Sequence, residues 1–338
     1  MNIRKRDVLF LCQYFYPEYI SSATLPLDTA VALADAGYEV GVLCGYPKEY
    51  CSINGVPLRE THMGVDIQRL RYLQLRRSHV VGRLVNYFSF VLVVLLHFLE
   101  LGRYKAIVVY SNPPILPIAA AMANACFGTK VVFVSYDVYP EIAIATSTIS
   151  EGSLIARVMR LVNRLLFRRV TKVVALSDDM KQFLLKNRPL LSKDQVEVIY
   201  NWHHGETDLD DYDPSGSALV SQLKSEGDFV VSYIGNMGIC QELDTIVDAI
   251  RQLRDEPHIK FLVAGLGSGM EVLRRAVVAE GLRNVTILGF LGGYDLKAAL
   301  AASDCFVLSL AKGLTGLCFP SKLYSYMMAG RPVVACKR

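Results

Sequence analysis

The feature that most constrains this 338-residue chain is an alternation of strand and helix patterns that restarts halfway along the sequence. Short apolar runs bounded by turn residues predict strands, and apolar residues at helical spacing between them predict helices. Such an alternation is typical of a parallel sheet whose faces are covered by helices. The length allows two domains, each with its own core. The sequence therefore predicts an α/β protein with two Rossmann-like domains in series.

The expected elements divide between the two halves. Strands are expected at 8–14, 39–44, 106–110, 130–136 and 172–176, then at 229–235, 260–265, 285–289, 305–310 and 332–335. The clearest expected helices are 25–36, 153–169, 241–254, 270–280, 294–302 and 321–329. We expect domains at 1–202 and 229–338, joined by a polar linker at 203–228.

Charge and cysteine content narrow the function classes. Residues 1–176 carry 19 Lys/Arg against 12 Asp/Glu, so an anionic partner is expected on the first half. The eight cysteines form no C-x-x-C pair, which favours reduced thiols in a cytosolic protein. The apolar run after the basic start breaks into Gln13 and Tyr14, and we interpret it as a strand and not a signal peptide.

Three strand-to-helix turns of the second half carry residues suited to a nucleotide. Ligands of such sheets lie beyond the carboxyl ends of the strands, at helix N-termini. The candidate positions are Gly235, Asn236, Gly238 and Gln241 in "GNMGICQ", Gly265, Leu266 and Gly267 in "GLGSG", and Ser321 and Lys322 in "PSK". Glycines permit close backbone approach, and a lysine in the first helical turn can bind a diphosphate. An ordinary tight turn is the alternative for either glycine loop alone.

Several stretches, in their order along the chain, resemble one known family. "GNMGICQELDTIVDAI", "FLVAGLGSG", "PSKLYSYMMAGRPVVA" and "YDVYPE" are similar to the retaining glycosyltransferases of family 4, most of all the branch that builds capsule, O-antigen and exopolysaccharide chains. The resemblance covers essentially the whole chain. It implies the GT-B fold, a nucleotide-sugar substrate held mainly by the second domain, and neither cofactor nor metal.

The resemblance also assigns roles to residues. It implies that Asn236, Gly238 and Gln241 lie near the donor diphosphate, that residues 265–267 lie near the base, and that Ser321 and Lys322 meet the phosphates. Asp137 follows a strand where the family places polar groups facing the anomeric centre, and Glu141 is a second candidate for this role. A carboxylate there can stabilise an oxocarbenium-like transition state. For Asp137, a turn residue is the alternative.

The chain departs from its family at two places. Counting back from "AG" of the last helix, a glutamate pair common in the family falls on Leu317 and Ser325, so Ser325 stands where a glutamate usually holds the ribose. Relatives also continue past "PVVA", so we expect a second domain that is truncated.

Two basic stretches of the first half favour an anionic surface. Arg76 and Arg77 lie in the acid-free run 69–83, before an apolar stretch at 84–99 that is a core helix, an interfacial helix or a short span. Arg157, Arg160, Arg164 and Arg168 recur at spacings of a helix stripe. Because arginines at i and i+4 repel one another, we expect a dense negative charge nearby, such as an anionic membrane leaflet or a lipid-linked acceptor. No aromatic platform interleaves with them, so a nucleic acid is not expected.

The sequence thus predicts a glycosyltransferase that moves a sugar, with retention, from a nucleoside-diphosphate sugar (a UDP-sugar foremost) to a lipid-linked saccharide in surface polysaccharide assembly. Its expected place is the cytoplasm, peripheral at the inner face of the cell membrane. Two alternatives stay open. One is a non-catalytic, membrane-associated member of an assembly complex, and the other is a nucleotide-sugar epimerase on the same fold.

Overall fold

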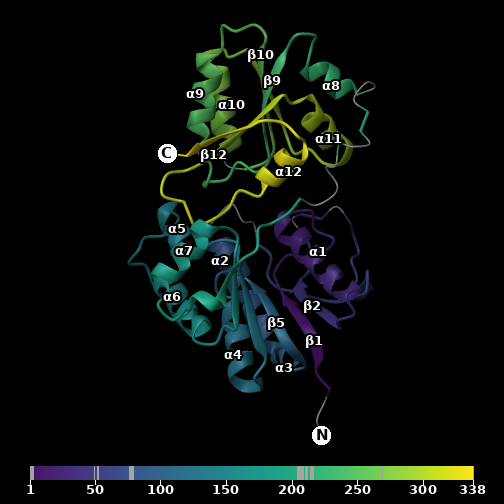
Figure 1. Ribbon diagram of the computed structural model, residues 1–338, viewed down its shortest axis with the longest axis vertical. Coiled ribbons are helices and arrows are strands. Elements are labelled where there is room, and N and C mark those ends of the chain that lie inside the picture. The colour runs from purple at the N-terminus through teal and green to yellow at the C-terminus, as the bar shows by residue number, and fades with distance from the viewer. Residues whose placement is uncertain are drawn as a thin grey trace. The chain divides into compact units, whose positions relative to one another are not determined.

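The structure is a computed structural model that describes residues 4–337, except 49, 52, 76–79, 204–208, 210–211, 214–216 and 268. The chain divides into two compact units, one of Met1–Tyr200 with Thr315–Phe319 and the other of Asn201–Leu314 with Pro320–Arg338. Each unit is built on its own sheet with covering helices (Figure 1). The predicted fold class, α/β with two Rossmann-like sheets, is confirmed.

The first unit contains an eight-stranded sheet in the order β3-β4-β2-β1-β5-β6-β7-β8. Its strands are β1 Arg6–Leu11, β2 Val40–Gly45, β3 Arg59–His62, β4 Val65–Leu70, β5 Tyr104–Tyr110, β6 Lys130–Ser135, β7 Lys172–Ala175 and β8 Val196–Val198. Only β3 runs antiparallel, against β4. Six neighbouring strands, in the sheet order β4-β2-β1-β5-β6-β7, follow the Rossmann order. In this order the chain reverses its direction across the sheet between β1 and β5.

Strands β3, β4 and β8 were not predicted. In β4 the polar residues hide the signal, because Arg69 lies in an apparently basic surface run and yet is buried in the structure. Its guanidinium donates to Glu60 at 2.5 Å and to the Pro57 and Tyr16 carbonyls at 2.8 and 2.7 Å. A buried arginine is tolerated only with such partners, and these partners come from distant parts of the sequence.

The helices of the first unit are α1 Ser21–Asp35, α2 Val80–Leu96, α3 Phe98–Leu101, α4 Pro117–Phe127, α5 Glu141–Ala145, α6 Leu154–Phe167 and α7 Asp178–Asn187, with a 3₁₀ turn at Lys193–Gln195. Helix α4 contacts both α2 and α6. Helix α1 covers β1, β2 and β4, where Phe10, Val42 and Ile67 form part of a buried cluster.

Helix α2 differs from a core helix, which was one of the interpretations of 84–99. Phe90 and Val94 are buried, but Leu92 and Leu96 are 60% and 76% exposed. The buried Asn86 side chain accepts from the Leu75 N–H at 2.7 Å and donates to its carbonyl at 2.9 Å, which binds the preceding segment to the helix. In the described part of the chain, no helix has the length and hydropathy needed to span a membrane.

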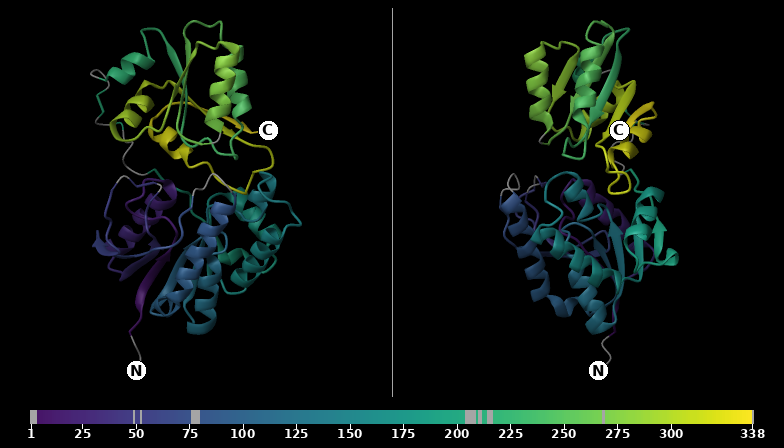
Figure 2. Two further views of the ribbon diagram at one scale, coloured as in Figure 1. Left: turned by 180° about the vertical axis from the view of Figure 1, so that it is seen from behind. Right: turned by 90° about the vertical axis from the view of Figure 1, so that its left-hand side faces the viewer.

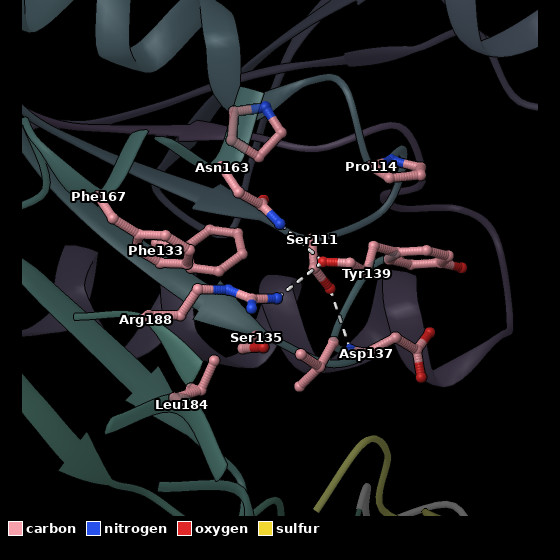
Figure 3. A pocket seen from close by; sticks show the side chains of 12 residues that line it. Ser111, Pro114, Phe133, Ser135, Asp137, Tyr139, Asn163, Phe167, Leu184 and Arg188 are labelled. Carbon is pink, nitrogen blue, oxygen red and sulfur yellow. Dashed lines mark hydrogen bonds between the residues drawn. The ribbon is translucent and has the colours of Figure 1, made fainter. Parts of the chain in front are cut away.

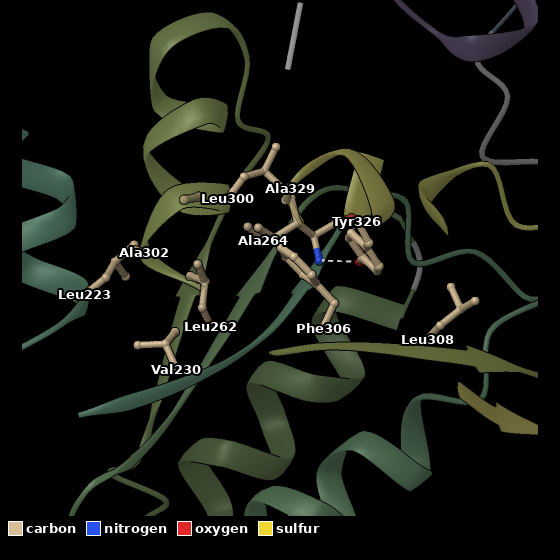
Figure 4. Close-up of a cluster of buried hydrophobic side chains, with 12 residues drawn as sticks. Leu223, Val230, Leu262, Ala264, Leu300, Ala302, Phe306, Leu308, Tyr326 and Ala329 are labelled. Carbon is tan, nitrogen blue, oxygen red and sulfur yellow. Dashed lines mark hydrogen bonds between the residues drawn. The ribbon is translucent and has the colours of Figure 1, made fainter. Parts of the chain in front are cut away.

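The second unit contains a five-stranded parallel sheet in the order β11-β10-β9-β12-β13. Its strands are β9 Phe229–Ile234, β10 Ile259–Ala264, β11 Val285–Leu288, β12 Cys305–Leu310 and β13 Val333–Lys337, and its helices are α8 Ala218–Leu223, α9 Leu243–Gln252, α10 Gly269–Glu280, α11 Gly293–Ala302 and α12 Lys322–Met328. Helices α9 and α10 cover one face, and α8, α11 and α12 pack against the other (Figure 2). Figure 4 shows the core on the α12 face, centred on Phe306 and Tyr326.

The expected domain limits and linker stay predictions, since most of 204–216 lies outside the described residues. The last part of the expected linker contains α8, whose Leu223 is buried in the core of the second unit.

Candidate functional site

Two glycine loops of the second unit lie backbone against backbone. Gly235 and Gly265 follow β9 and β10 with φ of +141° and +145°, in the region that favours glycine. A Cβ on Gly265 would lie 2.0 Å from the Gly235 carbonyl oxygen, and one on Gly267 would lie 2.4 Å from the Met237 oxygen. Met237 N donates to the Leu266 carbonyl at 2.7 Å, which joins the two loops directly. Only glycine permits this approach, so these positions are structurally required.

Lys322 opens helix α12 and reaches back to the first of these loops. Its ammonium group donates to the Asn236 carbonyl at 2.9 Å and to the Tyr233 hydroxyl, and lies 4.1 Å from the centroid of the Tyr233 ring. Burial lowers the pKa of Lys322 to about 7. No carboxylate in the described part of the chain pairs with the lysine to offset this effect. An anion arriving here would restore its charge.

Tyr326 fixes the helix that carries this lysine. Its hydroxyl accepts from Ile234 N at 2.8 Å and donates to Ile234 O at 2.9 Å, while its ring stacks on Phe306 at 4.2 Å (Figure 4). Helix α12 is therefore attached to the last residue of β9, immediately before the glycine loop. Sequence reasoning missed both Tyr326 and Tyr233. Their only signal is spacing, since Tyr326 stands one helical turn after Lys322 and Tyr233 shares a strand face with Gly235.

The other expected donor residues lie on the same loops and helix. Gln241 N donates to the Gly238 carbonyl at 3.2 Å, while Asn236 and Leu266 are exposed. Ser321 precedes α12 without a side-chain capping bond, and Ser325 lies one turn further along. The structure thus brings Gly235, Asn236, Gly265, Gly267 and Lys322 into one corner.

Asp137 lies in the first unit, directly after β6, and lines a small pocket (Figure 3). Its N–H and that of Tyr136 both donate to the Ser111 hydroxyl, at 3.1 and 3.0 Å. The backbone also forms a bridge with Cys318, and Val138 N donates to the Leu317 carbonyl at 2.8 Å. The loop is therefore held from both sides by main-chain contacts.

Within the described part of the chain, no cation or hydrogen-bond donor pairs with the Asp137 carboxylate. It accepts no hydrogen bond from the described residues, and burial raises its pKa to about 6. Figure 3 shows it directed away from Arg188. A carboxylate that is partly desolvated and uncommitted is typical of a functional position, whereas a turn aspartate usually bonds its own backbone.

Glu141 is committed to an ion pair. Its carboxylate accepts from Arg188 at 2.6 Å, and Arg188 also donates to the Tyr139 carbonyl at 3.2 Å. Asn163 donates to the same carbonyl at 2.7 Å (Figure 3). These bonds fix the loop after Asp137, so Asp137 is the stronger of the two catalytic candidates.

The expected basic stripe is present on α6. Arg157, Arg160 and Arg164 are exposed on the helix, and exposed Arg168 is its C-cap. Arg160 donates to the Glu151 carbonyl at 3.0 Å. Arg76 and Arg77 lie outside the described residues.

Comparison with known proteins identifies the family. Residues 23–202 match the family model "Glycosyl transferase 4-like domain", and residues 228–338 match "Glycosyl transferases group 1". The chain is 24% identical over 225 residues to the probable glycosyltransferase WbjE of Pseudomonas aeruginosa, covering 67% of this chain and 55% of WbjE. It is 27% identical over 204 residues to the putative colanic acid biosynthesis glycosyl transferase WcaI of Escherichia coli K12, covering 58% and 47%. The matches thus span about half the length of these relatives.

Solved structures share the fold. Anabaena HepE in complex with UDP and glucose has a TM-score of 0.70 and 19% identity, over 98% of this chain and 80% of HepE. WaaG, a glycosyltransferase involved in lipopolysaccharide biosynthesis, has a TM-score of 0.69 and 15% identity, over 97% and 80%. The family model over residues 23–202 covers more than half of the chain, and the solved structures share the fold of both units over 97–98% of the chain. The chain therefore belongs to the glycosyltransferase 4-like family with a GT-B fold.

Proposed function

We propose that this protein transfers a sugar, with retention, from a nucleoside-diphosphate sugar to a saccharide acceptor in surface polysaccharide assembly. The observation that carries the proposal is the Lys322 corner, where a desolvated amine lies against a glycine loop and has no counter-charge among the described residues. A diphosphate supplies that charge. UDP is the proposed nucleotide, supported by the UDP complex of the structurally similar HepE.

In this proposal the second unit holds the donor. The diphosphate lies against Lys322, with Asn236, Gly238, Gln241 and Ser321 near it and residues 265–267 near the base. Because glycines leave the backbone uncovered, the nucleotide can approach the main chain of both loops. Ser325 takes the position near the ribose and offers one hydroxyl there.

Asp137 is the proposed catalytic carboxylate of the first unit. As the bond between the sugar and the diphosphate breaks, positive charge develops on the sugar and negative charge on the leaving group. An ionised Asp137 stabilises the first and Lys322 the second. Glu141 acts by holding the neighbouring loop through Arg188.

The test of the donor site is calorimetry with UDP and with uridine. We expect UDP to bind, and Lys322→Met to weaken UDP binding while leaving uridine binding nearly unchanged, because the lysine acts on phosphate. Equal losses for both ligands would make the lysine a structural residue. The absence of heat at millimolar UDP would refute the donor assignment, and the anomeric configuration of the product tests retention.

The acceptor is proposed to be a lipid-linked saccharide reached at the inner face of the cell membrane. The α6 stripe supports this, since each arginine near an anionic leaflet contributes about 1 kcal/mol. We expect binding to vesicles with anionic lipid that weakens as salt rises. Changing Arg157, Arg160, Arg164 and Arg168 to Gln is expected to release the protein and leave UDP binding intact. Equal binding to neutral and anionic vesicles would contradict this.

A non-catalytic role in an assembly complex is the second candidate. Leu317 and Ser325, at positions where the family resemblance implies glutamates, favour it. UDP binding without turnover of any UDP-sugar, even by hydrolysis, would support this candidate over the first.

A further inference from the structure

The first unit has an apolar groove between α2 and α6 that the proposed donor chemistry does not use. The groove encloses about 190 Å³. Apart from the Tyr87 hydroxyl, its lining side chains are hydrocarbon or thioether, and they include Leu84, Phe88, Pro114, Ile155, Val158 and Met159. Such a cavity can accept hydrocarbon but gives a sugar or phosphate few hydrogen-bonding partners.

Two of the side chains that line the groove, Phe88 and Leu154, are exposed, and another exposed leucine follows each of them along its helix. On α2, Phe88 and Leu92 are 53% and 60% exposed, and on α6, Leu154 and Leu161 are 75% and 54% exposed. Large side chains exposed in such rows mark surfaces that bind apolar partners. A hydrocarbon chain can therefore enter the groove from the side.

The groove lies next to the pocket of the candidate catalytic carboxylate. Pro114 lines both this groove and the pocket that contains Asp137, and both lie within the first unit. A molecule whose chain lies between α2 and α6 can thus direct its other end toward Asp137.

A positive charge stands at the rim of the groove. Arg157 is one helical turn after Leu154, which lines the groove, and residues at i and i+3 are neighbours on a helix surface. Arg157 is exposed and has no acidic partner in the described part of the chain. A phosphate next to the hydrocarbon chain matches this charge.

We propose that the groove between α2 and α6 binds the hydrocarbon chain of the acceptor lipid, with the acceptor's phosphate at Arg157 and its saccharide end toward Asp137. The inference rests on the proposed transfer to a lipid-linked acceptor and names the site that recognises the lipid. The chain of one acceptor molecule occupies the groove, which differs from a general contact with the bilayer.

The test compares dodecyl phosphate with butyl phosphate, two probes with the same head group, by calorimetry below the micelle concentration. Each buried methylene strengthens binding about fourfold. Burial of four of the additional methylenes predicts that dodecyl phosphate binds roughly 200-fold more tightly, with one molecule per chain. Equal affinity for the two probes overturns the proposal.

Variants locate the binding. Val158→Trp fills the groove and is expected to remove the preference for dodecyl phosphate, while Val278→Trp, the same change at an 82% exposed position of α10, retains it. Val158→Phe provides a smaller change in the same place if the tryptophan variant does not fold. Arg157→Gln is expected to weaken both probes by the same factor. If both groove variants, Val158→Trp and Val158→Phe, keep the preference for dodecyl phosphate, the proposal is wrong.

Two further measurements separate the alternatives. UDP binding, measured on the same samples, tests the donor site independently, so UDP binding without a chain-length preference refutes only the groove. Vesicle binding separates the groove from a bilayer contact. If Val158→Trp loses vesicle binding but keeps its affinity for dodecyl phosphate, the surface is a membrane contact and the proposal is wrong.

Discussion

The low pKa of Lys322 makes donor binding dependent on pH. In the free protein, burial lowers the pKa of this lysine to about 7, so the amine is half charged at pH 7. A diphosphate beside it favours the charged form and raises the pKa again. Between pH 7 and pH 9, UDP binding is therefore coupled to the uptake of a proton.

The magnitude follows from the charged fraction of the free protein. With a pKa of about 7, this fraction falls from about one half at pH 7 to about one hundredth at pH 9. The dissociation constant of UDP is then expected to rise about 50-fold, equivalent to about 2 kcal/mol. The second ionisation of a phosphate lies near pH 6, so UDP keeps its full phosphate charge over this range.

Calorimetry in buffers of different ionisation enthalpy measures both the affinity and the proton uptake. Lys322→Met is expected to bind UDP weakly with no dependence on pH. Lys312→Met removes an exposed lysine nearby in sequence and is expected to retain the pH dependence. An affinity of the unchanged protein that is constant from pH 7 to pH 9, or binding without proton uptake, would refute the reasoning.

Three further variants test other parts of the structure. Asp137→Asn is expected to lower kcat about 100-fold with little change in the KM for donor. Because the pKa of Asp137 is about 6, the unchanged enzyme should lose activity as the pH falls below 6, and the variant should lack that dependence. Full activity in the variant would make Asp137 a turn residue. Gly265→Ala places a Cβ 2.0 Å from a backbone oxygen and is expected to lower the free energy of unfolding by about 3 kcal/mol or more. The control Gly281→Ala, where nothing lies within 4 Å of the added Cβ, is expected to lower it by about 1 kcal/mol. Similar losses for the two variants in urea denaturation would contradict the close approach of the loops. Glu141→Gln removes the counter-charge of Arg188, whose side chain is only 12% exposed, and should lower the free energy of unfolding by about 1–3 kcal/mol. The control Glu151→Gln, at an 81% exposed side chain, should change it by no more than about 0.5 kcal/mol. Equal melting temperatures for the two variants would argue against the anchoring role of Glu141.

The sequence by itself determined the layers of this protein and the loops that carry the candidate donor site. Strands β9 to β13 and helices α9 to α12 were predicted, since buried parallel strands read as apolar runs and helices show a clear period, whereas α8 lies in the stretch expected to be a linker. The glycines at 235, 265 and 267 were identified for the same reason, because the residue type alone reports a backbone that needs φ above zero or close approach. The arginine stripe of α6 follows from spacing along one helix.

Only the tertiary structure decided how the candidate residues are used. Lys322 acquires its low pKa from burial against Tyr233 and the loop after β9, and Glu141 is bound by an arginine 47 residues away. The Asp137 loop is held by Leu317 and Cys318, from a segment distant in sequence that joins the first unit. Desolvation and pairing depend on which side chains meet across the fold, and local pattern carries no information about such encounters. The same holds for Arg69. Its place in a basic run suggested the surface, but the half-buried carboxylate of Glu60 and two backbone carbonyls hold it inside the protein.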